Sequence, residues 1–310
     1  MRRRDRAPPW TRLLSVPAHS LDSMLAVGDQ NYPLCLLDTM AVSEMVKRPQ
    51  GAFRHFLEWS HAGQTPFVPG FTVYTLIELR RKPELFQQFI EQFHPFPCVL
   101  LKGYMELLAE EAASYPDPSQ IDPCSIAFTP LGDEGNLLSN LPRILELPEI
   151  AMQEEEWNKA GPEIVDGMVS LVQNYRPAGA TYTPEETRQF VSMASLQQLA
   201  YHDHVELIQR VHGDGEAVDM DAFPTLKAMT YTVFHKFYAD HNRKPSNSDA
   251  FDVLIAALLP YVEAFITENH QTEVLRKTKR RDNFLGGLQV FTLRDFRDAP
   301  PIATVHSSRA

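Results

Sequence analysis

Short apolar runs that end at a polar or acidic residue recur along the chain. The run 34–37 lies between Pro33 and Asp38, and Cys98–Leu101 is a second run of the same kind. Unbroken apolarity over four residues with such boundaries is typical of a strand buried on both faces of a parallel sheet. Further strands are predicted at 263–267 and 288–292, with a short strand or connector at 65–69.

Apolar residues at helical spacing separate these predicted strands. The clearest example is 52–59, where Phe53, Phe56 and Leu57 share one face. Strands that alternate with helices indicate βαβ units, so the sequence predicts an α/β fold with a parallel sheet. The other predicted helices of this kind are 72–81, 226–238, 249–259 and 271–281.

A middle block, residues 104–225, interrupts this pattern. It is dense in Pro, Glu and Asp, lacks a strand pattern and contains helical stretches such as 189–212. We interpret it as an acidic helical insertion into an α/β domain built from residues 31–103 and 226–300. An Arg-rich flexible arm is predicted over residues 1–30, and a tail over 301–310.

The net charge of the insertion differs from that of the rest of the chain. The 310 residues carry a formal net charge of −11, which argues against binding nucleic acid or an anionic membrane through bulk charge. The insertion, however, holds 5 Lys and Arg against 22 Asp and Glu, and the remainder holds 24 against 18. The predicted α/β domain is therefore mildly basic, and a nucleic-acid partner is not excluded.

Other features of the sequence indicate a soluble protein of a reducing compartment. Cys35, Cys98 and Cys124 show neither a CxxC motif nor zinc-ligand spacing. No signal peptide is recognisable, and no apolar stretch approaches the roughly 20 residues of a membrane span. We expect a cytoplasmic protein without a membrane partner, and a homo-oligomer remains open.

Acidic side chains fall at the ends of the predicted elements. One follows the first buried strand, one lies among apolar residues of a helix, two lie three residues apart at a helix start, and the last follows a strand. The carboxyl ends of parallel strands share one edge of a sheet, where α/β proteins bind ligands. Carboxylates gathered there repel one another unless a cation neutralises them, and oxygen ligands favour Mg²⁺ or Mn²⁺. These residues are Asp38, Glu78, Asp249, Asp252 and Glu268, the last followed by Asn269.

Three blocks that contain these acids resemble the PIN-domain ribonucleases, in the order of that family. They are LLDTMAVSEMVKRP (36–49), TVYTLIELRR (72–81) and SDAFDVLIAALLPYVEAFITEN (248–269). The resemblance implies a three-layer αβα sandwich and a metal-dependent endonuclease that cleaves RNA. It also implies that Asp38, Glu78 and Asp252 are the catalytic, metal-binding acids. Asp249 is a competitor or partner for Asp252, and Glu268 or Asn269 takes a more variable fourth place.

A nuclease of this kind also needs positive charge for the phosphate backbone, since phosphate contacts give affinity without sequence specificity. Two basic groups lie close to the acids in the sequence, one beside Glu78 and one beyond the last block. The predicted substrate-binding residues are Arg80, Arg81, Arg276, Lys277, Lys279 and Arg280.

Alternative interpretations remain beside the nuclease. Met40 stands where the family usually has a polar residue. Together with Asn269 and the large acidic insertion, it favours a PIN-like scaffold that binds a protein partner and no longer cuts. Asp38 can be a helix N-cap, and the basic run at 276–281 a solvated helix face. Thr39 is expected to make only local hydrogen bonds.

The middle block offers a third function. His202, Asp203 and His204, with His212 and Asp214, suggest a metal phosphohydrolase of the HD type. Such enzymes need further His and Asp residues on other helices, and no convincing set is visible, so surface histidines explain the cluster more simply.

Overall fold

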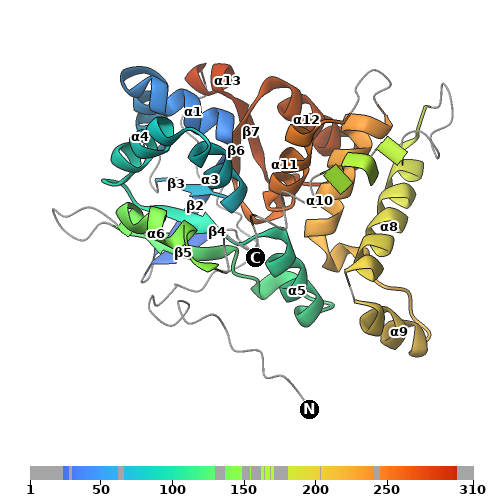
Figure 1. Cartoon of the computed structure of the whole chain (residues 1–310). Coiled ribbons are helices and arrows are strands. Elements are labelled where there is room, and N and C mark those ends of the chain that lie inside the picture. Colours follow the sequence, from blue (N-terminus) through green and yellow to red (C-terminus); the bar gives the residue numbers. More distant parts are fainter. Residues whose placement is uncertain are drawn as a thin grey trace, which may run out of the picture.

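The computed structural model describes residues 24–27, 30–61, 66–129, 137–148, 154, 162–163, 165–167, 169–170, 181–202, 204–239 and 245–298. Its strands form one mixed sheet in the order β5-β4-β3-β2-β6-β7, and β1 pairs with β2 outside this path (Figure 1). The predicted α/β class is confirmed. The sheet is not wholly parallel, because β1 and β5 are antiparallel to their neighbours. The strands are β1 Met24–Val27, β2 Gln30–Leu37, β3 Val68–Phe71, β4 Cys98–Leu101, β5 Cys124–Phe128, β6 Ala264–Thr267 and β7 Gln289–Thr292.

Strand β2 lies at the point where the strand order reverses. The chain runs from β2 through β3 to β4 on one side, then returns past β2 to β6 and β7. Leu36 of β2 is in parallel register with Gly70 of β3 and with Phe265 of β6. In open α/β sheets the crevice outside the carboxyl ends of the strands at such a reversal is the usual ligand site. The ends of β2 and β6 are therefore the first place to look for chemistry.

Helices cover both faces of the sheet, an arrangement compatible with a three-layer αβα fold. Successive side chains of β2 point to opposite faces, so Cys35 and Leu37 enter one core and Leu34 and Leu36 the other, all fully buried. The predicted doubly buried strand is confirmed. The first core includes residues of α1 Thr39–Lys47, α2 Arg54–Ser60, α3 Val73–Arg80, α4 Pro83–Phe93 and α6 Leu141–Leu145. The second includes residues of α5 Tyr104–Ser114, α11 Asn247–Ala256 and α12 Asn269–Asp282.

The prediction that residues 104–225 contain no strand is wrong. Strand β5 pairs antiparallel with β4 at the edge of the sheet. Its burial alternates, with Cys124, Ile126 and Phe128 inside, because only one face meets the core. That weak alternation over five residues lacks the unbroken apolar run used to find the central strands. Leu107 of α5 also belongs to the second core, so the α/β layers extend into the predicted insertion.

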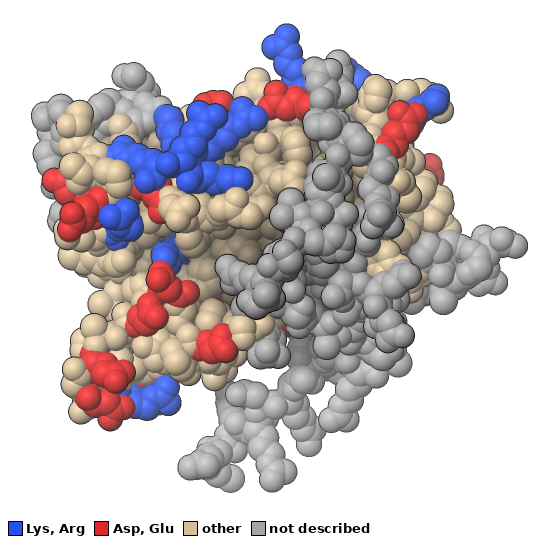
Figure 2. All heavy atoms as spheres, turned by 180° about the vertical axis from the view of Figure 1, so that it is seen from behind, with Lys and Arg blue, Asp and Glu red and all other residues tan. Residues whose placement is uncertain are grey.

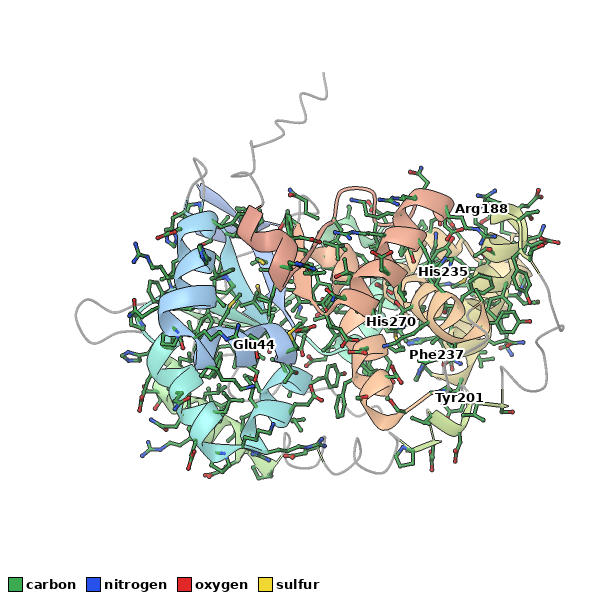
Figure 3. The ribbon with its side chains drawn as sticks, turned by 90° about the horizontal axis from the view of Figure 1, so that it is seen from above. Glu44, Arg188, Tyr201, His235, Phe237 and His270 are labelled. Carbon is green, nitrogen blue, oxygen red and sulfur yellow. The ribbon has the colours of Figure 1, made fainter. Side chains whose placement is uncertain are left out.

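The helical part has a small core of its own. Leu108, Leu199 and Phe223 belong to it and come from α5, α8 and the start of α10. Seen from above, Glu44 of α1 lies on the far side of the molecule from Arg188 and Tyr201 of α8, with His235 and His270 between them (Figure 3). The helices of this part are α8 Pro184–Tyr201, α9 Val205–Gly213 and α10 Pro224–Val233, which continues into a π-helical turn, η7 Phe234–Tyr238.

Several remaining predictions concern the ends and the cysteines. Met24–Val27 of the predicted arm forms β1 and Gln30 begins β2, whereas residues 1–23 and 28–29 of that arm and the tail 301–310 lie outside the described residues. The three cysteines are buried and free. Among the helices described, none has the length and apolarity that a membrane crossing requires. The remaining short elements are η2 Pro49–Phe53, η3 Pro118–Gln120, η5 Leu137–Asn140, η6 Met220–Ala222, η8 Leu259–Tyr261 and α13 Leu293–Asp298.

Candidate active site

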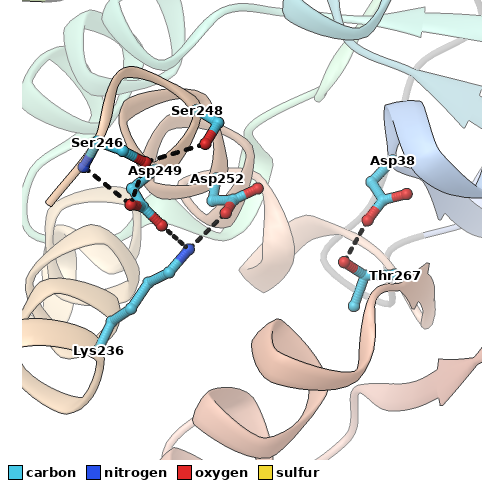
Figure 4. Close-up of polar contacts among 7 residues, drawn as sticks. All are labelled: Asp38, Lys236, Ser246, Ser248, Asp249, Asp252 and Thr267. Carbon is cyan, nitrogen blue, oxygen red and sulfur yellow. Dashed lines mark hydrogen bonds and ion pairs between the residues drawn. The ribbon is translucent and has the colours of Figure 1, made fainter. Parts of the chain in front are cut away.

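Asp38 joins the carboxyl end of β2 to the start of α1 and the end of β6. Its Oδ1 accepts a hydrogen bond from the backbone N–H of Ala41 at 2.7 Å, so it is the N-cap of α1 as the simplest interpretation predicted. Its Oδ2 accepts a hydrogen bond from the hydroxyl of Thr267, the last residue of β6 (Figure 4). Only 6% of Asp38 is exposed. One carboxylate therefore fastens the two strands of the reversal point at their ends.

The environment of Asp38 disfavours its charged form. Burial raises its pKa to about 7, against the opposing hydrogen bonds from Thr267 and Ala41. The carboxylates of Asp252 and Glu268 contribute to the same rise. Asp38 therefore shares the end of β2 with two further acids that the sequence predicted there.

Glu78 approaches the same edge from α3. Its Oε2 accepts a hydrogen bond from the hydroxyl of Thr39 in α1. The prediction that Thr39 bonds only locally is wrong, because α1 and α3 lie side by side and Thr39 faces across the gap. Burial raises the pKa of Glu78, the carboxylate of Asp252 raises it too, and Arg81 opposes both. Glu78 thus belongs to the same electrostatic group as Asp38 and Asp252.

The two acids of α11 have different surroundings. Asp249 is buried and completes a capping box, in which its Oδ2 accepts from the N–H and hydroxyl of Ser246 at 2.9 and 2.6 Å. Its Oδ1 lies 2.8 Å from the Nζ atom of Lys236, which also contacts Oδ2 of Asp252. Both oxygens of Asp249 are therefore engaged within the protein.

Asp252 lies between Lys236 and the other acids. One of its oxygens contacts Lys236, and the other is directed to the side on which Asp38 lies (Figure 4). Burial raises its pKa, Lys236 counteracts this, and Glu268 and Asp249 raise it again. Of the pair that the sequence left open, Asp252 faces the acid group and Asp249 supports it. At the fourth place Glu268 interacts with Asp38 and Asp252, whereas Asn269 is an exposed first residue of α12.

The carboxylate oxygens of these acids are of the kind that binds a divalent cation. In the present structure, however, they do not converge on a single position where one ion could be held. Carboxylate oxygens are the preferred ligands of Mg²⁺ and Mn²⁺, and a cation would relieve the repulsion that raises these pKa values. Within the described ranges, no three His, Cys, Asp or Glu residues lie close enough together to hold a metal ion. The hydroxyls of Thr39 and Thr267 and the ammonium of Lys236 each hold one carboxylate oxygen. Ligation of one ion by three of these residues requires their carboxylates to move closer together. We call Asp38, Glu78, Asp252 and Glu268 the acid cluster.

Three of the predicted substrate-binding residues already have protein partners. Arg80 forms an ion pair with Glu154 and donates a hydrogen bond to the carbonyl of Leu145 at 3.2 Å. Arg276 pairs with Asp295 at 2.6 Å. Lys279 donates a hydrogen bond to a backbone carbonyl, and burial lowers its pKa.

The other three are open to solvent. Arg81 is exposed at the end of α3, with its guanidinium 5.7 Å from the ring centre of Phe251. Lys277 and Arg280 are exposed on α12, and Figure 2 shows Lys and Arg side chains gathered on the side of the molecule where α12 lies. Positive charge therefore flanks the acid cluster on α3 and follows it along α12.

The histidine-rich segment has no comparable arrangement. The ring of His202 contacts that of Tyr104 edge-on at 5.7 Å, and His212 and Asp214 are exposed. Asp203 lies outside the described residues. The exposed His212 and Asp214 agree with the simpler interpretation as surface residues, whereas His202 is half-buried against an aromatic ring.

An apolar cavity of about 300 Å³ lies at the opposite edge of the sheet. Its lining includes Tyr32, Val68 and Pro97, at or near the amino ends of β2, β3 and β4, and contains no carboxylate. It is separate from the acid cluster, and its lining offers no carboxylate that could bind a cation.

Sequence reasoning missed two residues of the site. Thr267 contacts Asp38 from 229 positions away, and only the sheet pairing brings them together. Lys236 had a signal in the sequence, since it is a lone lysine within the apolar segment FHKFY. An unneutralised charge there predicts a buried partner, and the partner proved to be the acid pair of α11.

Comparison of the chain with models of protein families, with curated proteins and with solved structures found no match.

Proposed function

We propose that this protein is a metal-dependent endonuclease that hydrolyses phosphodiester bonds in RNA. The observation that supports this most strongly is the acid cluster. Its carboxylates come from four separate places in the fold, interact with one another, and lie at the reversal point of the sheet. Like charges placed together in a partly buried crevice cost stability, and such arrangements are concentrated at functional sites.

The acid cluster would hold Mg²⁺ or Mn²⁺. A bound ion of this kind polarises a phosphodiester and lowers the pKa of a bound water, so that no nucleophile from the protein is needed. Asp38 is fixed for this role by Ala41 and Thr267, and Glu78 by Thr39. The preference for RNA over DNA rests on the resemblance of the three sequence blocks to PIN-domain ribonucleases.

The chain's own cations would position the substrate. Arg81 lies three residues beyond Glu78 and is exposed, and Lys277 and Arg280 extend along α12, which begins directly after Glu268. Contacts from these side chains to phosphates orient a nucleic acid without reading its sequence. A strand bound along this line passes over the acid cluster.

Cleavage of labelled single-stranded RNA in the presence of Mn²⁺ tests the proposal. We expect the wild type to cut the RNA, EDTA to abolish cleavage, and Asp38→Asn to reduce the rate by about 10²–10⁴-fold. Glu58→Gln, which removes an exposed acid of α2 outside the acid cluster, is the matched control and leaves the rate unchanged. Cleavage that survives both EDTA and Asp38→Asn would contradict the proposal.

The pairing of Lys236 with Asp252 favours a second candidate, a PIN-like scaffold that binds a protein without cutting. A lysine already neutralises one of the acids that an ion would use. The two functions differ in a direct measurement, because a scaffold binds no Mn²⁺ at the acid cluster in a calorimetric titration.

A further inference from the structure

Lys236 is a fully buried cation at the rim of the acid cluster. Its exposed fraction is 0%, and its ammonium contacts one oxygen of Asp249 and one of Asp252. Removing an ammonium from water costs several kcal/mol, which only close opposite charges offset. The ammonium therefore depends on the two carboxylates of α11, as they depend on it.

The backbone around Lys236 is adapted to this placement. Helix α10 widens at its end into the π-helical turn η7, all five residues of which are buried. Single π-turns within helices are uncommon and occur often at functional sites. The turn carries Lys236 toward α11, while His235 beside it pairs with Asp282 of α12 at 2.7 Å. The turn η7 is thus tied to α11 through Lys236 and to α12 through His235.

The carboxylate of Asp252 lies between the ammonium of Lys236 and the side on which Asp38 lies. One oxygen faces the Lys236 ammonium, and the other is directed to the side of Asp38 (Figure 4). In two-metal nuclease sites, two cations lie about 4 Å apart and stabilise the attacking and leaving oxygens. Here a fixed ammonium already lies on one side of Asp252. Both oxygens of Asp249, the nearest further carboxylate on α11, are occupied by Lys236 and Ser246.

We propose that Lys236 takes the place of a second metal ion, so that the site binds a single divalent cation between Asp252 and the other members of the acid cluster. This inference rests on the proposed nuclease function, because it concerns the ion of the same site. Lys236 is a positioning residue: it fixes Asp252 and supplies one permanent positive charge without touching the substrate.

The number of bound Mn²⁺ ions tests this inference without any activity measurement. Free Mn²⁺ is followed by electron paramagnetic resonance as metal is added to the full-length protein. We expect one ion per wild-type chain and two per chain in Lys236→Met, where Asp249 and Asp252 lose their shared counter-charge. Lys236→Arg keeps the charge and remains at one ion. Lys227→Met, a lysine of α10 that pairs with Asp221 away from the acid cluster, is the matched control and also remains at one.

Thermal unfolding supplies a second readout, because Lys236→Met leaves two buried carboxylates without a partner. We expect its melting temperature to fall in EDTA and to rise more steeply with Mn²⁺ than that of the wild type. Lys236→Gln, whose amide can still donate to one carboxylate, is the second variant if the methionine variant does not fold, and it is also expected to bind two ions.

The possible outcomes separate this inference from the function on which it rests. A wild type that binds no Mn²⁺ overturns the proposed nuclease and this inference with it. Two ions per wild-type chain, or one ion in both Lys236→Met and Lys236→Gln, overturn only the role of Lys236. If Lys236→Met folds in neither EDTA nor Mn²⁺, the result for Lys236→Gln decides, and one ion per chain in that variant also contradicts the role of Lys236.

Discussion

Asp38 and Glu111 are two buried carboxylates whose pKa burial raises to about 7, but they have different neighbours. Glu111 of α5 is fully buried, and its Oε1 accepts hydrogen bonds from the hydroxyl of Tyr261 at 2.5 Å and the N–H of Thr225 at 2.9 Å. It fastens the sheet side of the molecule to α10. Asp38 also fastens two elements, β6 and α1, but at the edge where other acids lie.

The difference lies in what opposes the effect of burial. Around Glu111 the neighbours are donors, which lower the pKa. Around Asp38 donors lower the pKa as well, but Asp252 and Glu268 raise it. A raised pKa caused by burial alone therefore identifies a structural acid as readily as a functional one. Additional like charges are what distinguish the acid cluster, because a protein gains nothing structural by gathering them.

The strongest way to break this comparison is to neutralise each acid and measure cleavage. We expect Asp38→Asn to lose about 10²–10⁴-fold in rate while it folds normally without metal, since the amide oxygen still caps α1 and one repulsive charge is gone. Glu111→Gln should retain the wild-type rate. Equal losses in both variants, measured on the same labelled RNA, would show that the two carboxylates do not differ in role.

The second test compares stability across pH for the wild type and Glu111→Gln. Because the folded-state pKa of Glu111 is raised from 4.5 to about 7, the folded state holds its proton more tightly than the unfolded state. This contribution to stability is fully present below the unfolded pKa and is lost as pH rises from about 4.5 through about 7, to the extent of about 3 kcal/mol.

Glu111→Gln should therefore lose less free energy of unfolding between pH 4.5 and 8 than the wild type, as measured by urea denaturation. The variant pays a constant cost, because its amide nitrogen replaces Oε2, which has no hydrogen-bond partner in the described structure. A pH profile parallel to that of the wild type would mean that Glu111 titrates normally in the folded protein.

Divalent ions give a third and smaller contrast. A ligand at about 100 times its dissociation constant stabilises the folded state by about 2.7 kcal/mol, or some 2–4 °C per kcal/mol for a chain of comparable size. We expect Mg²⁺ to raise the melting temperature of the wild type and of Glu111→Gln alike, and to have no effect on Asp38→Asn. If Mg²⁺ raised the melting temperature of Asp38→Asn as much as that of the wild type, the ion would bind outside the acid cluster.

The sequence could predict the parts of this arrangement that depend on local pattern. The unbroken apolar runs of β2 and β6 and the acids that follow them, Asp38 and Glu268, are visible in the chain itself. What it could not predict depends on long-range pairing: the bond from Thr267 to Asp38, and the bonds that Tyr261 and Thr225 make to Glu111. Strand β5 was missed for a related reason, since an edge strand with one buried face has only a short alternation to mark it.

The smallest expected effect is a change in RNA affinity when an acid that pairs with a predicted substrate-binding residue is neutralised. Glu154 of the insertion pairs with Arg80, two residues beyond Glu78, and both are partly exposed. Partly exposed pairs contribute about 0–1 kcal/mol, so Glu154→Gln should release Arg80 and raise RNA affinity by no more than about fivefold at fixed salt. The charged competitor is lost, while the acid cluster and the pH dependence due to Glu111 stay as they were.

The converse variants, Lys277→Ala and Arg280→Ala, should each weaken binding and reduce the salt dependence of the affinity by about one unit of slope, because each removes one phosphate contact. Fluorescence anisotropy with the Asp38→Asn protein, which binds without cutting, measures both effects in one assay. Should Glu154→Gln lower the affinity, the ion pair would be supporting the binding surface, and the acidic insertion would be part of the RNA site rather than a competitor for it.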